Sequence, residues 1–398
     1  MSEKNNKYTP NLRFPEFSGE WEETKLGEVT RNEDSKRRPI SKMDRAVGEY
    51  PYYGANGIQD HVNDYIFDGD YLLVGEDGSV LTKENTPVIN WASGKFWVNN
   101  HAHVLSQKDD TSLKLISYLL SGVKIDGLVT GIPPKFNQDN LNTISIPLPP
   151  SPAEQQKIAS CLSAMDDLIA AQAEKVEALK EKKTGLMQQL FPQPGETTPH
   201  LRFPEFTGEW EVKKLGEVAK IQNGYAYDST TFSYEGDYVI RISDIQNGIV
   251  SLTTAVRSLC NVPETFKVVK GDILIAMSGA TTGKIGEYRN EEKAYINQRV
   301  GNIKPFDINK KILLFLMQSD LFANYLSGIL TVGAQPNISS QQISSFPFLL
   351  PPSPAEQEKI ASCLSALDDQ IAAETEKLTA LKDYKKGLMQ QLFPQPAK

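Results

Sequence analysis

"PPSPAEQQKIASCLSAMDDLIAAQ", residues 149–172, is repeated almost unchanged as "PPSPAEQEKIASCLSALDDQIAAE" at residues 351–374. The identity extends further, because residues 149–194 and 351–396 share 36 of 46 positions at a constant offset of 202. A repeat of this length indicates one structural unit that is built twice along the chain. We call these two copies segments B and B′.

A second pair of repeats precedes the first. Residues 10–29 (segment A) and 199–218 (segment A′) share 16 of 20 positions at an offset of 189. The chain therefore has the order A–x–B–A′–y–B′, with dissimilar inserts at about 30–148 (insert x) and 219–350 (insert y). Because the two offsets differ by 13, insert x is 13 residues shorter than insert y. Two nearly identical frameworks thus carry two different inserts.

The start and end of each B segment are those of a helix. Ser151 is placed as an N-cap, Pro152 occupies the first helical position, and Glu154 completes a capping box. Both copies end at "LFPQP", where Pro192 and Pro394 block continuation of the helix. We therefore expect two long helices of nearly equal length.

One narrow face of each helix carries apolar residues in 4-3 spacing, which is typical of a coiled-coil seam. Polar residues take the remaining seam positions, namely Gln172 and Lys183 in the first copy and Glu374 and Lys385 in the second. The first seam contains Ile158, Leu162, Met165, Ile169, Val176, Leu179, Leu186 and Leu190, and the second contains Ile360, Leu364, Leu367, Ile371, Leu378, Leu381, Leu388 and Leu392.

We expect the two helices to pair with each other as an antiparallel coiled coil, about 48 Å long at ~1.5 Å per residue. Gln172 and Glu374, near the middle of the seams, would fix the register, and Cys161 and Cys363 are interpreted as small packing residues. The alternative is that each helix packs only on its own domain. The predicted fold class is α+β, with two α/β domains separated by two long helices and related by a pseudo-two-fold. Its predicted divisions are residues 1–148, 149–194, 195–350 and 351–398.

Composition and charge limit the class of protein. The 398 residues are 39% hydrophobic and 23% charged, and no apolar run approaches the ~20 residues that span a bilayer. Three cysteines, none in a CxxC pair, and the polar start "MSEKNNKYTP" favour a cytoplasmic location. The net charge of −8 argues mildly against nucleic acid as a partner, so DNA binding would require local patches or a basic partner.

The inserts read as short β-segments followed by a helix, at residues 111–122 in x and 309–328 in y. The order of features corresponds: "FDGDYLLVGEDGSV" matches "VKGDILIAMSGATTG", and "GKFWVNNHAHVLS" matches "EKAYINQRVGNIK". The ends "TGIPPKFNQDNLNTISIPLPP" and "TVGAQPNISSQQISSFPFLLPP" also correspond. We predict that both inserts have one α/β fold with different surface chemistry.

No catalytic or metal-binding motif is convincing. "SGATTGKIG" (278–286) lacks the glycine spacing and the Ser/Thr of a P-loop, so its glycine-rich turn and Lys284 are better suited to a DNA phosphate. Asp272 with residues 291–293 only superficially matches the residue spacing of a nuclease metal site. His101 and His103 have no third ligand at a suggestive spacing, and a polar surface role is expected for both.

The loops of both inserts are rich in residue types that read base edges, since Asn and Gln pair with adenine and Arg and Lys with guanine. Insert x offers Arg37, Arg38, Asn56, Gln59, Lys95, Asn99, Asn100, Lys135 and Asn137. Insert y offers Gln222, Asn223, Tyr225, Arg241, Gln246, Asn247, Thr282, Lys284, Asn297, Gln298, Arg299 and Asn337.

Taken together, the sequence resembles the specificity (S) subunit of type I restriction–modification enzymes. The resemblance covers essentially the whole chain and rests on the doubled "LPPSPAEQ", on "LKEKKTGLMQQLFPQ" with "LKDYKKGLMQQLFPQ", on "FPEFSGEWEETKLGEV", and on "KGDILIAMSGATTGKIG" and "INQRVGNIKP". It implies that each insert is a target recognition domain for one half of a bipartite DNA site.

The resemblance also implies partners and cofactors. Two modification (M) subunits would bind this chain and supply S-adenosylmethionine-dependent adenine methylation, and restriction (R) subunits with ATP and Mg would join them. The chain itself would carry no cofactor, no metal and no catalytic residue. Two alternatives stay open from the residues alone: an autonomous DNA-modifying or DNA-cleaving enzyme, and a coiled-coil adaptor that binds proteins through its inserts.

Overall fold

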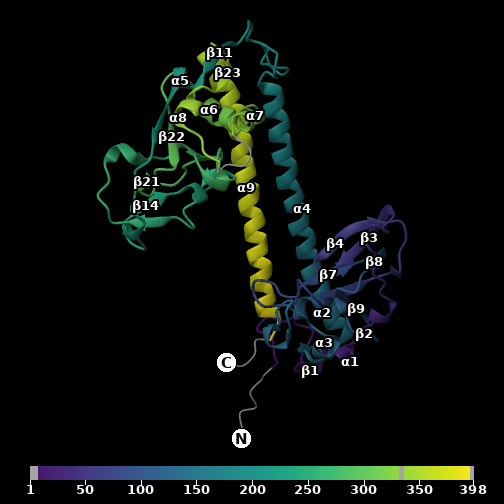
Figure 1. Ribbon diagram of the computed structural model, residues 1–398. Coiled ribbons are helices and arrows are strands. Elements are labelled where there is room, and N and C mark those ends of the chain that lie inside the picture. Colours follow the sequence, from purple (N-terminus) through teal and green to yellow (C-terminus); the bar gives the residue numbers. More distant parts are fainter. Residues whose placement is uncertain (1–7, 331–335, 395–398) are drawn as a thin grey trace. The chain divides into compact units, whose positions relative to one another are not determined.

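The computed structural model describes residues 8–330 and 336–394. The chain divides into two compact units, each of which contains one insert (Figure 1). Unit 1 reaches to Ala173 and resumes at Glu376, and unit 2 is Glu174–Thr375. Each unit therefore contains one insert domain together with one half of each long helix.

The two long helices are α4 (Pro152–Leu190) and α9 (Pro354–Leu392), of 39 residues each. Both begin at the predicted proline, and every predicted seam position is buried or half-buried. In unit 1, Leu162 near the start of α4 shares a core with Leu392 at the end of α9. In unit 2, Leu190 at the end of α4 shares a core with Leu364 near the start of α9. The predicted antiparallel pairing is therefore confirmed.

The lysines in the seams are neutralised by the opposite helix. In unit 2, Lys183 forms an ion pair of 2.6 Å with Asp368 and lies 5.0 Å from the ring centroid of Phe315. In unit 1, Lys385 pairs with Asp166, whose carboxylate also accepts a hydrogen bond of 2.7 Å from Tyr118. The same arrangement thus recurs in both units at equivalent places in the repeat.

Segments A and B are joined by a buried ion pair that the sequence reading missed. The Glu154 carboxylate, expected to complete a capping box, instead accepts hydrogen bonds of 2.8 and 2.7 Å from Nε and Nη2 of Arg13. Arg202 of segment A′ contacts Glu356 in the same way, at 2.8 and 2.9 Å. Both glutamates are 1% exposed. Because A supplies the cation and B the anion, the two repeats form one structural element.

In the described residues, the domain of unit 1 contains three sheets and three short α-helices. A two-stranded sheet pairs segment A with the end of insert x, just before segment B, and two four-stranded sheets form the body of the insert. Their orders are β1 (Glu22–Lys25)–β10 (Ser145–Leu148); β2 (Thr30–Asn32)–β9 (Ala102–Gln107)–β6 (Tyr71–Gly75)–β7 (Ile89–Ala92); and β4 (Gly57–Val62)–β3 (Val47–Gly54)–β8 (Lys95–Val98)–β5 (Phe67–Asp68). The helices are α1 (Leu26–Val29), α2 (Leu113–Leu120) and α3 (Gln138–Thr143).

The domain of unit 2 repeats this plan with larger sheets. Their orders are β11 (Glu211–Lys214)–β23 (Pro347–Leu350); β12 (Ala219–Asn223)–β22 (Val300–Pro305)–β19 (Ile273–Ala276)–β20 (Ile285–Glu287)–β16 (Gly248–Val250)–β15 (Ile245–Gln246); and β13 (Phe232–Ser233)–β17 (Val256–Ser258)–β14 (Asp237–Ile240)–β21 (Ala294–Ile296)–β18 (Lys267–Val268). The helices are α5 (Leu215–Val218), α6 (Lys310–Met317), α7 (Asp320–Ile329) and α8 (Ser340–Ser344).

The predicted common fold of the two inserts is confirmed by strand pairing. The order β2–β9–β6–β7 corresponds to β12–β22–β19–β20, with antiparallel pairing throughout. The second sheet has the parallel pair β3–β8 where the other unit has β14–β21. Insert y uses part of its extra length in β15 and β16, which extend the first sheet.

One helix prediction was wrong. The stretch 309–328 was expected to be one helix but forms α6 and α7, which are bent by 54°. Ser319 has extended backbone angles (φ −79°, ψ 161°) that interrupt the helix before α7 begins.

Among the described residues no single helix is long and apolar enough to cross a bilayer, although the bent pair of α6 and α7 passes that test by length and composition. Its first member is buried in the unit 2 core. The stretch 331–335 of the predicted repeat "TVGAQP" lies outside the described residues.

Candidate nucleic-acid interface

The turn between β21 and β22 holds three predicted base-reading residues, Asn297, Gln298 and Arg299, on a fixed backbone. Asn297 N donates to Ile240 O at 3.0 Å, Val300 N to Asn297 O at 2.8 Å, and Met277 N to Arg299 O at 2.9 Å. Val300 is fully buried, whereas Gln298 and Arg299 are exposed. The backbone of this turn is therefore held by the sheets while its side chains face solvent.

This turn forms one wall of a polar cleft of about 570 Å³ in unit 2. Four predicted residues line it: Asn223 at the end of β12, Gln298 and Arg299 from the turn, and Asn337 before α8. Asn337 is held there by a bridge to Ser278, although the two are 59 positions apart in sequence. The cleft thus gathers residues that only strand pairing brings together.

A buried hydroxyl also makes the cleft suited to binding. The Ser278 hydroxyl is buried and has no hydrogen-bond partner in the described structure, although Ser278 lines the cleft. A buried polar atom without a partner costs free energy unless another group satisfies it. Ser278, Ser339 and Ser340 were not predicted as site residues, because serine carries no distinctive signal in a loop-rich sequence.

The guanidinium groups of this protein are nearly all committed to internal contacts. Eight of the ten arginines, all within the described residues, contact an acceptor or a tyrosine in the fold. The remaining two are Arg38 in unit 1 and Arg299 in unit 2, both exposed and both predicted base-reading residues. Each unit therefore presents one arginine that is free to bind an external acceptor.

The corresponding turn in unit 1 carries different chemistry. Glu76 N donates to His101 O at 2.8 Å, as Met277 N donates to Arg299 O, so His101 takes the place of Arg299 and Asn100 that of Gln298. The His101 ring, however, is hydrogen-bonded to Asp77. The same backbone framework thus displays a free guanidinium in one unit and an imidazole paired with a carboxylate in the other.

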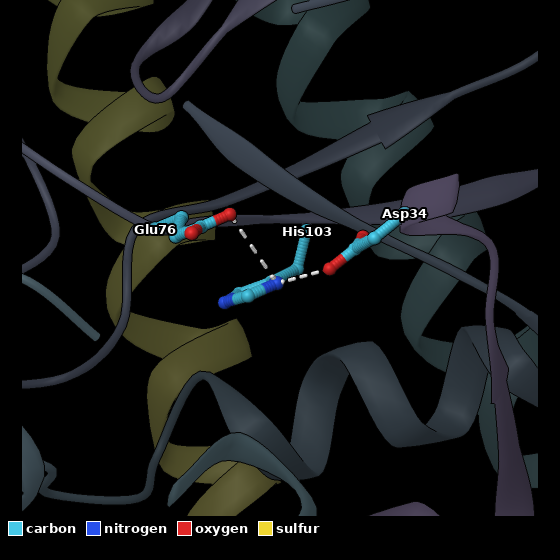
Figure 2. A group of neighbouring side chains, drawn as sticks. All are labelled: Asp34, Glu76 and His103. Carbon is cyan, nitrogen blue, oxygen red and sulfur yellow. Dashed lines mark hydrogen bonds and ion pairs between the residues drawn. The ribbon is translucent and has the colours of Figure 1, made fainter. Parts of the chain in front are cut away.

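Behind this turn lies a buried cluster of charged groups, shown in Figure 2. His103 of β9 is 1% exposed, so the surface role expected for it was wrong. Its Nδ1 lies 2.6 Å from Asp34 and 3.7 Å from Glu76, and its Nε2 lies 2.8 Å from Phe136 O. Both ring nitrogens therefore face acceptor oxygens inside the fold.

The same three side chains are close enough to hold a metal ion, with ligand atoms within 4.8 Å of one another. However, Arg37 donates to Glu76 at 2.5 Å and lies 3.3 Å from Asp34. The Arg37 guanidinium and the His103 ring therefore already occupy both carboxylates as internal partners. We interpret the cluster as an internal ion-pair network, in which the predicted base reader Arg37 takes part.

The Asp34 carboxylate titrates below its ordinary range. Burial opposes ionisation, but hydrogen bonds from His103 and Val104 N, with the charge of His103, lower the pKa of Asp34 overall. In unit 2, Gly301 takes the place of His103 and its surroundings are the apolar side chains of Ile275, Met277 and Ile221. The charged network is thus a feature of unit 1 alone.

The other predicted residues are spread over the two domains. Asn247 and Lys284 line a second hollow of about 430 Å³ in unit 2. Several others are engaged internally: Asn99 with His101 N, Lys135 with Glu76, Asn137 as the N-cap of α3, Gln222 with Thr265 O, Arg241 with Thr254 O, Gln246 with Ser243 O and Thr282 with Gly279 O. Asn56 and Gln59 are exposed in the β3–β4 hairpin, Lys95 covers Tyr65, and Tyr225 packs edge-on against Phe266.

Tyr225 and Arg38 occupy equivalent places. Arg38 N donates to Val98 O at the end of β8, and Tyr225 N donates to Ile296 O at the end of β21.

The residues considered for a nuclease site have structural contacts instead. Asp272 is 7% exposed and accepts from Asn302 at 2.9 Å, whereas Glu291 pairs with Lys270.

Comparisons with known proteins agree with this arrangement. The family model of the type I restriction modification DNA specificity domain matches residues 18–181 and 207–383. The type I restriction enzyme MjaVIII specificity subunit of Methanocaldococcus jannaschii is 28% identical over 417 aligned positions, which cover 98% of this chain and 95% of that protein. A putative type I specificity subunit of Haemophilus influenzae, S.HindORF215P, is 35% identical over 143 positions, or 35% of this chain and 37% of that protein.

A solved structure shows the same fold. The S subunit of a type I restriction–modification system from M. genitalium superposes with a TM-score of 0.69 at 17% identity, covering 98% of this chain and all of that one. The family model matches one copy in each repeat and most of the chain. With its two repeated domains and its paired helices, the chain belongs to the type I restriction–modification DNA specificity family.

Proposed function

We propose that this chain reads a bipartite DNA site, with each insert domain contacting one half-site. The observation that carries this proposal is the repeated turn after β8 and β21, in which two backbone hydrogen bonds correspond between the units while the side chains at the second and third positions differ. A common framework with different polar side chains fits two modules that read different sequences. The predicted divisions at 1–148, 149–194, 195–350 and 351–398 assign one recognition domain and one helix to each half of the chain.

We further propose that the chain is a non-catalytic subunit that works in the cytoplasm. Two M subunits would dock on the repeated framework, since two copies of one framework offer two equivalent binding places. They would bring S-adenosylmethionine and adenine methylation, and R subunits would add ATP- and Mg-dependent restriction. The net charge of −8 fits an assembly in which partners contribute positive charge to the DNA contact.

We propose that the long helices set the spacing between the half-sites. Inserting one heptad after Gln172 and one after Glu374 keeps the 4-3 seam of both helices in register. The helices would lengthen by about 10.5 Å, which corresponds to about three base pairs. Methylome sequencing of cells that express the variant with its M subunit should show a longer spacer and unchanged half-sites. A spacer of the original length would contradict the role of the helices as a ruler.

The function itself is tested with purified subunits. The chain with its M subunit should methylate adenine at a bipartite motif, and the chain alone should neither methylate nor cleave DNA. Turnover by the chain alone would refute the non-catalytic role. A complex that binds no DNA would instead favour a protein-binding adaptor.

A further inference from the structure

We propose that Arg299 reads a guanine in the half-site bound by unit 2, by donating both arms of its guanidinium to O6 and N7 of that base. This inference rests on the proposed DNA-reading function and names the chemistry of one position. Arg299 is the free arginine of unit 2, and its backbone is fixed by the hydrogen bond from Met277 N. A preorganised backbone lowers the entropy lost on binding, so the fork of the guanidinium can discriminate between bases.

The surroundings of Arg299 favour a base edge over a phosphate. Among the described residues that line the cleft, Arg299 is the single cation, and its neighbours are the amides of Asn223, Gln298 and Asn337 with several hydroxyls. Amides and hydroxyls can contact phosphates as well as bases, but the affinity of phosphate contacts comes from several lysine or arginine charges acting together. A single arginine set among amides better matches the donor and acceptor pattern of purines in the major groove. The unpartnered hydroxyl of Ser278 adds one more polar group at the same cleft.

The contrast with unit 1 limits the effect to one half-site. His101, at the place of Arg299, is engaged by Asp77, so the same turn does not offer a free cation there. The free arginine of unit 1, Arg38, takes the place of Tyr225 instead. We therefore expect loss of Arg299 to change one base position in one half-site and to leave the other half-site unchanged.

The experiment uses the full chain in complex with its M subunit. Adenine-methylation mapping first gives the motif of the wild-type complex. Affinity is then measured for that site and for sites in which each guanine of the motif is replaced, with the wild type, Arg299→Ala, Arg299→Lys and Arg31→Ala. Arg31 is an exposed arginine of unit 1, 62% exposed and outside the proposed interface, and serves as the matched control.

The wild type should prefer one guanine by roughly 5- to 150-fold over other bases. Arg299→Ala should lose that preference at that position alone, and Arg299→Lys should lose part of it, because lysine lacks the planar fork. Arg31→Ala should match the wild type. Since the Arg299 side chain is exposed and forms no hydrogen bond or ion pair in the described structure, thermal unfolding of its variants should be unchanged.

Three outcomes would overturn the inference. One is equal weakening at all sites with no change in base preference, which marks a phosphate contact. Another is an unchanged motif and affinity for Arg299→Ala. The third is a half-site in which no guanine replacement changes the difference in affinity between the wild type and Arg299→Ala. In all three cases the wild-type complex still recognises a bipartite site. Failure of the proposed function would look different, since the wild-type complex would then show no such site at all.

Discussion

Replacing Arg13 by alanine should destabilise unit 1 strongly, because it leaves a buried carboxylate without its partner. Arg13 donates to both oxygens of Glu154 and also to the backbone oxygens of Ser18 and Gly19. Breaking a buried ion pair by removing one partner costs about 3–5 kcal/mol. For a unit of roughly 200 residues this corresponds to a fall of about 6–20 °C in the unfolding temperature.

Scanning calorimetry of the full chain measures this fall directly. Arg202→Ala removes the equivalent partner of Glu356 and should lower the transition of unit 2 by a similar amount. Arg31→Ala, at an exposed arginine whose ion pair is 3.8 Å long, is the control and should change little. The double variant Arg13→Ala/Glu154→Ala should recover part of the loss, because no unpaired charge is then buried. A loss below about 1 kcal/mol, or a double variant less stable than Arg13→Ala, would refute the reasoning.

Two more predictions concern the seam and the charged cluster. Leu162→Ala and Leu364→Ala change fully buried seam positions and should each lower the free energy of unfolding by about 2–5 kcal/mol, as measured by urea unfolding. The control Leu168→Ala changes a 55% exposed position and should cost little. Similar losses at all three positions would contradict the seam assignment. The pKa of Asp34 is lower in the folded than in the unfolded state, so as the pH falls the unfolded state takes up a proton at this carboxyl before the folded state does. The ionised Asp34 therefore stabilises the fold above about pH 4, and this stabilisation is lost as the pH falls further. Urea midpoints between about pH 5 and 3 should therefore fall less for Asp34→Asn than for the wild type, and an equal fall would argue against the network.

The helices illustrate how far local pattern alone can reach. Their start at proline, their seam and their end depend on spacing within about 40 residues, so each could be predicted without knowing what they pack against. The common fold of the inserts was also predictable, because the order of strands is written along the chain. The break at Ser319 was not, since the apolar pattern continues across it and only the packing of α6 and α7 ends one helix and begins another.

The Arg13–Glu154 pair and the buried His103 were beyond sequence reasoning for a different reason. A glutamate three residues after a helix start fits a capping box, and nothing local indicates an arginine 141 positions away. Likewise, the period of two along β9 shows which residues share a face but not which face is buried. The partners of His103 come from three other segments, at Asp34, Glu76 and Phe136, and their placement depends on how the sheet is assembled.

The sequence by itself determined the doubling of the framework, the paired helices and the types of residue available to read bases. Tertiary structure alone decided which of those residues are free. Pairing of β12 with β22 brings Asn223 near the turn that carries Gln298 and Arg299, and the bridge to Ser278 adds Asn337 to the same cleft. The same framework ties Arg37 to Glu76 inside unit 1. The physical reason is that availability depends on contacts between distant segments, and a linear sequence does not show which charges the fold has already neutralised.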